Sequence, residues 1–196
     1  MANLVILGSG KGSNARRLIA YFKENPQIKI SALVSNKPRR GFLDISYDHR
    51  INLEIIKGPE LSDAKWINHL KLTYRPDLII LTGYMQLIPS EFIQTFSDKI
   101  INIHPSLLPQ FGGKGMYGNF VHEAVLNAQM QESGISIHLV NEEYDQGKIL
   151  FQKSCPVNHD DTIETLSSRI QELEHEFLPQ VIEQYLNGTI GEFKIQ

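Results

Sequence analysis

Cysteine, net charge and long apolar runs are all scarce in this sequence, and each scarcity excludes a class of protein. The single cysteine, Cys155, can form no internal disulfide and has no second cysteine with which to share a zinc ion. A formal net charge of −3 does not provide the basic surface that nucleic-acid binding requires. No apolar run approaches the roughly 20 residues of a membrane-spanning helix. We therefore expect small-molecule substrates, no nucleic acid and no membrane as partners, and we leave open whether the protein is a monomer or a homodimer.

The composition that remains is that of an ordinary globular protein. Of the 196 residues, 41% are apolar and 21% are charged, which is enough to build one hydrophobic core. The first residues, Met1-Ala2-Asn3, lack the basic segment and the cleavage site of a secretory signal peptide. The sequence predicts a single cytoplasmic domain over residues 1–196.

Strand-like and helix-like patterns alternate along the first half of the chain. Helical patterns lie between short apolar runs, which predict strands over residues 4–7, 28–34, 53–56, 78–81 and 100–103. This alternation is typical of an α/β fold, in which right-handed crossovers connect a mainly parallel, open twisted sheet with helices on both faces, as in Rossmann-like proteins. Two later strands, which can be antiparallel, are expected over residues 135–140 and 149–157.

Helix boundaries are marked at two places. Ser62 is the expected N-cap of a helix that ends before Pro76. A long helical pattern covers residues 162–186, and we expect Pro179 to kink or interrupt it.

A glycine-rich turn follows the first predicted strand. Gly10, Gly12 and Ala15 have the spacing of the dinucleotide-binding fingerprint, between a strand and a helix. The second strand, however, ends without the carboxylate that holds the ribose of NAD, so we expect no NAD. Backbone N–H groups at a helix N-terminus still form an anion site, to which Ser13 and Asn14 can add donors. The alternative is a tight turn without a ligand.

A candidate catalytic group begins at the end of the fifth predicted strand. Alternation along that strand places Asn102 and His104 on the same side. Asp145, in the connection between the two later strands, is a candidate partner for the histidine. An amide donor, an imidazolium and a carboxylate suit addition to a carbonyl, because the first two stabilise an oxyanion and the carboxylate keeps the imidazole charged and oriented. A histidine with a purely structural role at the strand end is the alternative.

The other histidines give weaker signals. His138 alternates within the sixth predicted strand and can face either the candidate site or the core. The remaining four are expected at the surface: His49, His69, His122 and His159. Because the histidines are scattered and the cysteine is isolated, the sequence predicts no metal site.

Three motifs together resemble a known family. They are residues 10–14 (Gly-Lys-Gly-Ser-Asn), residues 102–109 (Asn-Ile-His-Pro-Ser-Leu-Leu-Pro) and residues 145–147 (Asp-Gln-Gly). The second is similar to the signature of the folate-dependent formyltransferase superfamily, and the first resembles its glycinamide ribonucleotide branch, the phosphoribosylglycinamide formyltransferases. The resemblance extends from about residue 3 to residue 190.

The resemblance implies a role for particular residues. It implies that Asn102, His104 and Asp145 are catalytic. It implies substrate binding, at the phosphate and the ribose, by Gly12, Ser13, Asn14, Gln171 and Glu174. It implies folate binding by Met85, Gln86, Leu87, Ile88, Asn102, Val140, Asn141, Glu142, Glu143 and Tyr144. Gln86 stands where the family usually has an arginine.

The resemblance also implies the reaction. The formyl group of the co-substrate 10-formyltetrahydrofolate would pass to the amine of 5-phosphoribosylglycinamide, a step of de novo purine biosynthesis. Alternatives are a related formyl-folate enzyme, either a formyltetrahydrofolate hydrolase or a sugar-nucleotide formyltransferase, and a non-catalytic nucleotide-binding module. A non-catalytic module would have no need for Asn102, His104 and Asp145 together.

Overall fold

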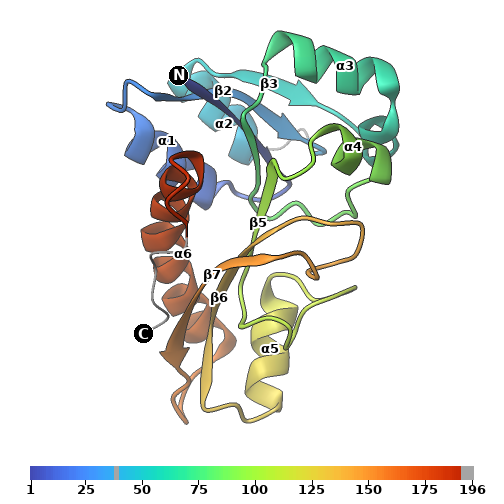
Figure 1. Cartoon of the computed structure of the whole chain (residues 1–196). Helices are drawn as coiled ribbons and strands as arrows, with labels where there is room; N and C mark the ends of the chain where they lie inside the picture. The colour runs from blue at the N-terminus through green and yellow to red at the C-terminus, as the bar shows by residue number, and fades with distance from the viewer. Residues whose placement is uncertain (38–39, 191–196) are drawn as a thin grey trace. The chain divides into compact units, whose positions relative to one another are not determined.

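The computed structural model describes residues 1–37 and 40–190 of the chain. The chain forms two compact units, Met1–Asn102 and Ile103–Gln196. Figure 1 shows the helices and strands of both. The expectation of one domain over residues 1–196 stays a prediction.

The first unit is built on parallel strands. These are β1 (Ala2–Gly8), β2 (Ile28–Ser35), β3 (Asn52–Ile55), β4 (Leu78–Leu81) and β5 (Ile100–His104), whose last two residues belong to the second unit. β1 pairs in parallel with both β2 and β4, β2 with β3, and β4 with β5. Every residue of β4 is buried, as its run of four uncharged aliphatic residues predicts.

Helices follow the strands of this unit. They are α1 (Ser13–Phe22), α2 (Arg40–His49), the 3-10 helix η1 (Gly58–Ser62), α3 (Ala64–Thr73) and α4 (Ser90–Thr95). The prediction that Ser62 caps a helix is wrong, because Asp63 is the N-cap of α3 and its carboxylate accepts a hydrogen bond from the Lys65 amide at 2.8 Å. Ser62 ends η1 instead, where its hydroxyl donates to the carbonyl of Pro59 at 2.8 Å.

The second unit contains an antiparallel strand pair and two helices. They are α5 (Asn119–Asn127), β6 (Glu132–Leu139), β7 (Ile149–Pro156) and α6 (Ile163–Leu186). α6 runs without interruption through Pro179, which is buried. The helix begins with a reciprocal cap, in which the Thr162 side chain accepts from the Thr165 amide and the Thr165 side chain accepts from the Thr162 amide.

Hydrogen bonding orders the strands as β3-β2-β1-β4-β5-β6-β7. The expected fold class, a mainly parallel α/β sheet with antiparallel late strands, is confirmed. The carboxyl ends of β1 and β5 carry the glycine turn and His104 respectively, and ligands of open parallel sheets bind beyond such ends. Among the described helices, none combines the length and apolar character needed to cross a membrane.

Candidate active site

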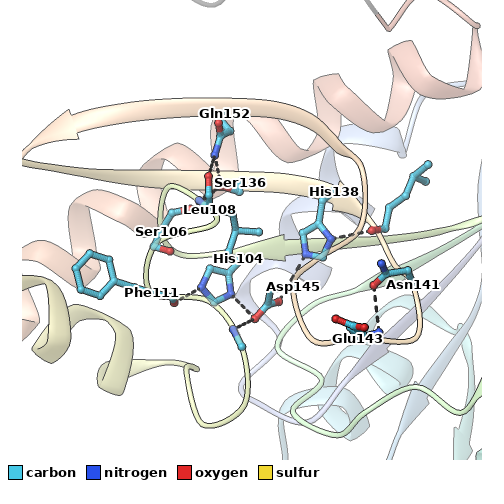
Figure 2. Close-up of polar contacts among 12 residues, drawn as sticks. His104, Ser106, Leu108, Phe111, Ser136, His138, Asn141, Glu143, Asp145 and Gln152 are labelled. Atoms are coloured by element: carbon cyan, nitrogen blue, oxygen red, sulfur yellow. Dashed lines mark hydrogen bonds and ion pairs between the residues drawn. The ribbon is translucent and has the colours of Figure 1, made fainter.

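His104 is the last residue of β5, and its side chain is buried. Its ring nitrogen Nε2 lies 2.8 Å from the carbonyl oxygen of Phe111, in the long loop that follows (Figure 2). Because a carbonyl oxygen only accepts, Nε2 carries a hydrogen and Nδ1 is the nitrogen left for a second partner. Asn102 is half-buried two residues earlier on the same strand, so the two side chains share one face of β5.

Asp145 supplies that second partner. Its Oδ2 atom lies 3.5 Å from Nδ1 of His104 and accepts a hydrogen bond of 2.9 Å from the amide of Gly113. Burial alone would raise the pKa of Asp145, but the interactions with His104 and His138 and the Gly113 amide outweigh burial and hold the pKa well below its usual range. The carboxylate is therefore ionised at neutral pH.

The backbone around Asp145 is shaped to present this carboxylate. Asp145 has a φ of 56°, in the left-handed region, which aspartate tolerates better than most side chains. A Cβ added at Gly112 would lie 2.5 Å from Cδ2 of Leu108 and 3.3 Å from Cβ of Asp145. Glycine at this position lets the loop approach Asp145 closely enough for the next amide to bind the carboxylate.

His138, on β6, belongs to the same cluster. Its Nε2 atom lies 3.6 Å from Oδ1 of Asp145, and its Nδ1 atom lies 2.8 Å from the carbonyl oxygen of Leu139 (Figure 2). The side chain is buried. Of the two orientations that the sequence allowed, the structure shows the one that faces Asp145.

A buried polar network fixes the turn that follows His104. The hydroxyl of Ser136 donates to the carbonyl of Ser106 at 2.6 Å and accepts from the Leu108 amide at 2.9 Å. The side-chain amide of Gln152, on β7, donates to the same hydroxyl at 2.8 Å and to the Leu108 carbonyl at 3.0 Å (Figure 2). These bonds attach the turn to β6 and β7, which restricts how His104 can move. Sequence reasoning missed both Ser136 and Gln152.

The prediction that His122 is a surface residue is wrong. His122, on α5, is only 4% exposed, because the apolar face of the helix that holds Val121 and Val125 turns it inward as well. Burial lowers the pKa of His122, and the charge of His104 lowers it further. His49, His69 and His159 are exposed as expected.

The glycine turn in the first unit has the geometry that an anion site needs. Gly12 is the N-cap residue of α1 with a φ of 79°, and no side chain caps the helix there. A Cβ at Gly12 would lie 2.5 Å from Cδ1 of Ile45, so both the backbone conformation and the contact with α2 require glycine. Ser13 and Asn14 form the first turn of α1, at the positive end of the helix dipole. Phosphate binding at residues 12–14 stays a prediction.

The predicted folate segment, residues 85–88, also lies in the first unit. Met85 and Leu87 are 43% and 45% exposed, so their apolar side chains are available for contact with a planar ring. Gln86 accepts a hydrogen bond of 3.1 Å from the hydroxyl of Tyr84, and its side chain lies against Gly58. Burial raises the pKa of Tyr84 to about 12, so its hydroxyl is available as a donor. Ile88 is buried and anchors the segment.

The other predicted binding residues lie in the second unit. In the connection between β6 and β7, the side-chain oxygen of Asn141 accepts from the amide of Glu143 at 3.2 Å, while Glu142 is exposed and Val140 and Tyr144 are half-buried. Gln171 and Glu174 lie on α6, three residues apart and so on one face of the helix. The structure places the Asp145 carboxylate 3.5 Å from Nδ1 of His104 and 3.6 Å from Nε2 of His138, and the roles of the binding residues stay predictions.

Within residues 1–37 and 40–190, the side chains of histidine, cysteine, aspartate and glutamate form no group of three able to hold a metal ion. The cluster consists instead of two imidazoles around one carboxylate, and both imidazoles are buried. Such groups suit the stabilisation of an oxyanion and the movement of a proton during acyl transfer.

Comparison with known proteins agrees with this chemistry. Residues 2–182 match the formyl transferase family, so the chain belongs to that family. Similar named members are phosphoribosylglycinamide formyltransferases. The chloroplastic enzyme of Arabidopsis thaliana is 38% identical, over 98% of this chain and 66% of its own length. The Bacillus subtilis enzyme is 34% identical, over 95% of both chains.

Solved structures extend the comparison. The phosphoribosylglycinamide formyltransferase of Anaplasma phagocytophilum is 34% identical, with a TM-score of 0.85 over 95% of this chain and 87% of that one. The relatives differ in length. This chain spans 59% of the length of the Vigna unguiculata enzyme and 19% of the length of the trifunctional purine biosynthetic protein of Bos taurus. The resemblance stated from the motifs is confirmed.

Proposed function

We propose that this protein transfers the formyl group of 10-formyltetrahydrofolate to the amine of 5-phosphoribosylglycinamide, a step of de novo purine biosynthesis. The observation that carries the proposal is the contact of 3.5 Å between Nδ1 of His104 and the Asp145 carboxylate. His104 stands two residues after Asn102 on β5, in a chain that matches the formyl transferase family over residues 2–182. The names of the similar relatives supply the substrate.

The first chemical step is the attack of the glycinamide amine on the formyl carbon. A carbon–nitrogen bond forms, and the carbonyl electron pair moves onto oxygen. Asn102 would donate its amide N–H to that oxygen, and the His104 imidazolium would stabilise its charge. One well-placed donor to an oxyanion contributes roughly 10²–10³ in kcat.

The second step breaks the bond between the formyl carbon and N10 of the folate. The oxygen electron pair re-forms the carbonyl, and N10 leaves with a proton that originates on the attacking amine. His104, or a water molecule held by Asp145, would carry this proton. The ionised carboxylate of Asp145 supports that role because it lies 3.5 Å from Nδ1 of His104, where it can hold the imidazole in one orientation.

The binding residues divide between the two substrates. The backbone amides of residues 12–14 would hold the phosphate of the nucleotide, supported by the uncapped N-terminus of α1. Gln171 and Glu174 would contact the ribose and phosphate end. Residues 85–88 and 140–144 would line the folate site.

The experiment that tests the proposal compares acceptors at one folate concentration. The purified chain receives 10-formyltetrahydrofolate together with 5-phosphoribosylglycinamide, an amino sugar nucleotide, or no acceptor. The proposal expects turnover with 5-phosphoribosylglycinamide at least 10²-fold faster than in the other two reactions. Equal deformylation without an acceptor would instead identify a hydrolase, and turnover only with the sugar nucleotide would identify the other relative.

A binding measurement accompanies that assay. Titration calorimetry should detect a 10-formyl folate analogue and should detect no NAD, because β2 ends without a carboxylate for the ribose hydroxyls. Binding of NAD without binding of the folate analogue would favour the nucleotide-binding module.

A further inference from the structure

We propose that Tyr84 is a positioning residue of the folate segment, residues 85–88. Its hydroxyl holds the side chain of Gln86 against Gly58, so that the two exposed apolar side chains of the segment face the folate. The proposal deepens the proposed function and rests on it for the identity of the ligand. The contacts that carry it lie within the first unit and need no substrate.

The chain enters the folate segment from a fixed point beyond the end of β4. The carbonyl of Gly83 accepts a hydrogen bond of 3.3 Å from the amide of Ser9, which follows β1. Gly83 has a φ of 68°, in the left-handed region that glycine adopts without strain. Tyr84 comes directly after this attached turn and is buried, whereas residues 85–87 are exposed. Side-chain contacts from Tyr84 can therefore control how the exposed residues lie.

The hydroxyl of Tyr84 makes such a contact. Tyr84 is 8% exposed, and its hydroxyl donates to Oε1 of Gln86 at 3.1 Å. Burial raises the pKa of Tyr84 to about 12, so the hydroxyl keeps its hydrogen at neutral pH. Because the hydroxyl stands at the end of a buried ring, it defines one position for the Gln86 amide. Phenylalanine in its place would keep the ring and lose only this bond.

Gly58 provides the surface against which that amide lies. A Cβ added at Gly58 would lie 2.5 Å from Oε1 of Gln86, 2.9 Å from its Cδ and 3.0 Å from its Nε2. The φ of Gly58 is not in the left-handed region, so the backbone does not itself require glycine there. Gly58 begins η1, which is held by a bond of 2.6 Å from the Lys57 amide to the Glu60 carboxylate and by the fully buried Leu61. The missing Cβ therefore leaves room for Gln86 on a fixed element.

The two contacts fix the residue that stands between the exposed apolar side chains. Met85 and Leu87, on either side of Gln86, are 43% and 45% exposed. Apparent affinity falls when only a fraction of the molecules holds the binding conformation, so a segment that is already in place binds its ligand more tightly. Tyr84 would thus raise the affinity for the folate without touching it.

The first experiment asks whether the hydroxyl positions Gln86 in the ligand-free chain. Glutamine side-chain amides are labelled with ¹⁵N, and the Gln86 resonance is identified as the one absent from Gln86→Ala. Tyr84→Phe should shift this resonance, and Tyr74→Phe should leave it in place. Tyr74 is the matched control, because it is also 8% exposed and its hydroxyl donates to Oε1 of Glu54 at 2.6 Å. A resonance that stays in place in Tyr84→Phe, or moves equally in both variants, would overturn the proposal.

Steady-state kinetics with 10-formyltetrahydrofolate test the consequence for binding. Tyr84→Phe should raise the KM for the folate by about three- to tenfold, as expected for the loss of one hydrogen bond, and should change kcat and the KM for the nucleotide by less than about twofold. Tyr74→Phe loses a comparable hydroxyl and should keep all three constants within about twofold of the wild type. If Tyr84 only stabilised the fold, both variants would lose stability and neither would change the KM for the folate, which would refute the positioning role. A wild-type chain that does not turn over the folate would refute the proposed function instead, and the resonance of Gln86 would still decide whether Tyr84 positions it.

A double variant tests whether Tyr84 and Gly58 act through the same side chain. Gly58→Ala places a methyl group where the Gln86 amide lies, so it should displace the amide and raise the KM for the folate by a factor similar to that of Tyr84→Phe. The KM of the double variant should exceed that of the larger single variant by less than about twofold, because the second change has no contact left to break. Increases that multiply would show that the two residues act separately, contrary to the proposal.

Discussion

Removal of the Ser136 hydroxyl tests whether the turn after His104 is held by its polar network. In Ser136→Ala the turn loses the bond to the Ser106 carbonyl at 2.6 Å and the bond from the Leu108 amide at 2.9 Å. Gln152 loses one of its two bonds and keeps the one to the Leu108 carbonyl at 3.0 Å. Ser136 is fully buried, so water does not easily replace the hydroxyl.

The expected loss follows from these three bonds. A neutral buried hydrogen bond contributes about 0.5–1.5 kcal/mol, and a buried group left without its partner costs about 1–3 kcal/mol. Together they predict a loss of about 2–4 kcal/mol in the free energy of unfolding. For a chain of this size, that loss corresponds to a decrease of about 5–15 °C in Tm.

The assay is thermal and urea unfolding followed by circular dichroism, with Ser133→Ala as the matched control. Ser133 lies on the same strand and is also buried, but its hydroxyl has no hydrogen-bond partner among the residues that the structure describes. Its replacement by alanine removes a buried hydroxyl without a partner and should therefore not lower the free energy of unfolding. If Ser136→Ala were no more destabilising than Ser133→Ala, the network would not be what holds the turn.

Three further predictions concern the proposed catalytic and binding residues. The pKa of Asp145 is depressed in the folded protein, so its contribution to stability is complete above about pH 4 and is lost as the pH falls further. Asp145→Asn should remove this pH dependence of stability and lower kcat by roughly 10²-fold or more. A variant with the acid unfolding and the rate of the wild type would show that Asp145 only shapes its loop. Gly12→Ala should raise KM for the nucleotide and lower Tm by several degrees, because alanine would have to adopt a φ of 79° and its Cβ would meet Ile45. An unchanged KM for the nucleotide would show that the phosphate binds elsewhere. Gln86→Ala should change folate affinity by less than tenfold, or about 1.4 kcal/mol, because Tyr84 already occupies its side-chain oxygen, and a hundredfold loss in calorimetry would show that Gln86 anchors the ligand.

Part of the fold could be predicted because its signals are local. β1, β4 and β5 are short apolar runs, and buried parallel strands have this pattern. α2 was not expected, because only Phe42 and Ile45 form its buried face while Leu43 and Tyr47 are exposed beside them. Apolar residues on both sides of a helix obscure the period that identifies it.

The candidate site was predictable where a motif marked it and not where tertiary contacts decide. His104 and Asp145 lie in quoted motifs, and the structure pairs them. Alternation along β6 places His138 and Ser136 on one face but cannot say which face meets Asp145. Ser136 and Gln152 are 16 residues apart, and a serine opposite a glutamine carries no distinguishing sequence signal.

The most direct test of the account follows the formyl carbon itself. The chain is incubated with 5-phosphoribosylglycinamide and 10-formyltetrahydrofolate labelled with ¹³C in the formyl group, and the products are resolved by nuclear magnetic resonance. The account predicts that the label appears in the new amide on the glycinamide nitrogen, and that His104→Ala lowers the rate of its appearance by at least about 10². Label recovered as formate, or a His104→Ala variant that forms the amide at the wild-type rate, would contradict it.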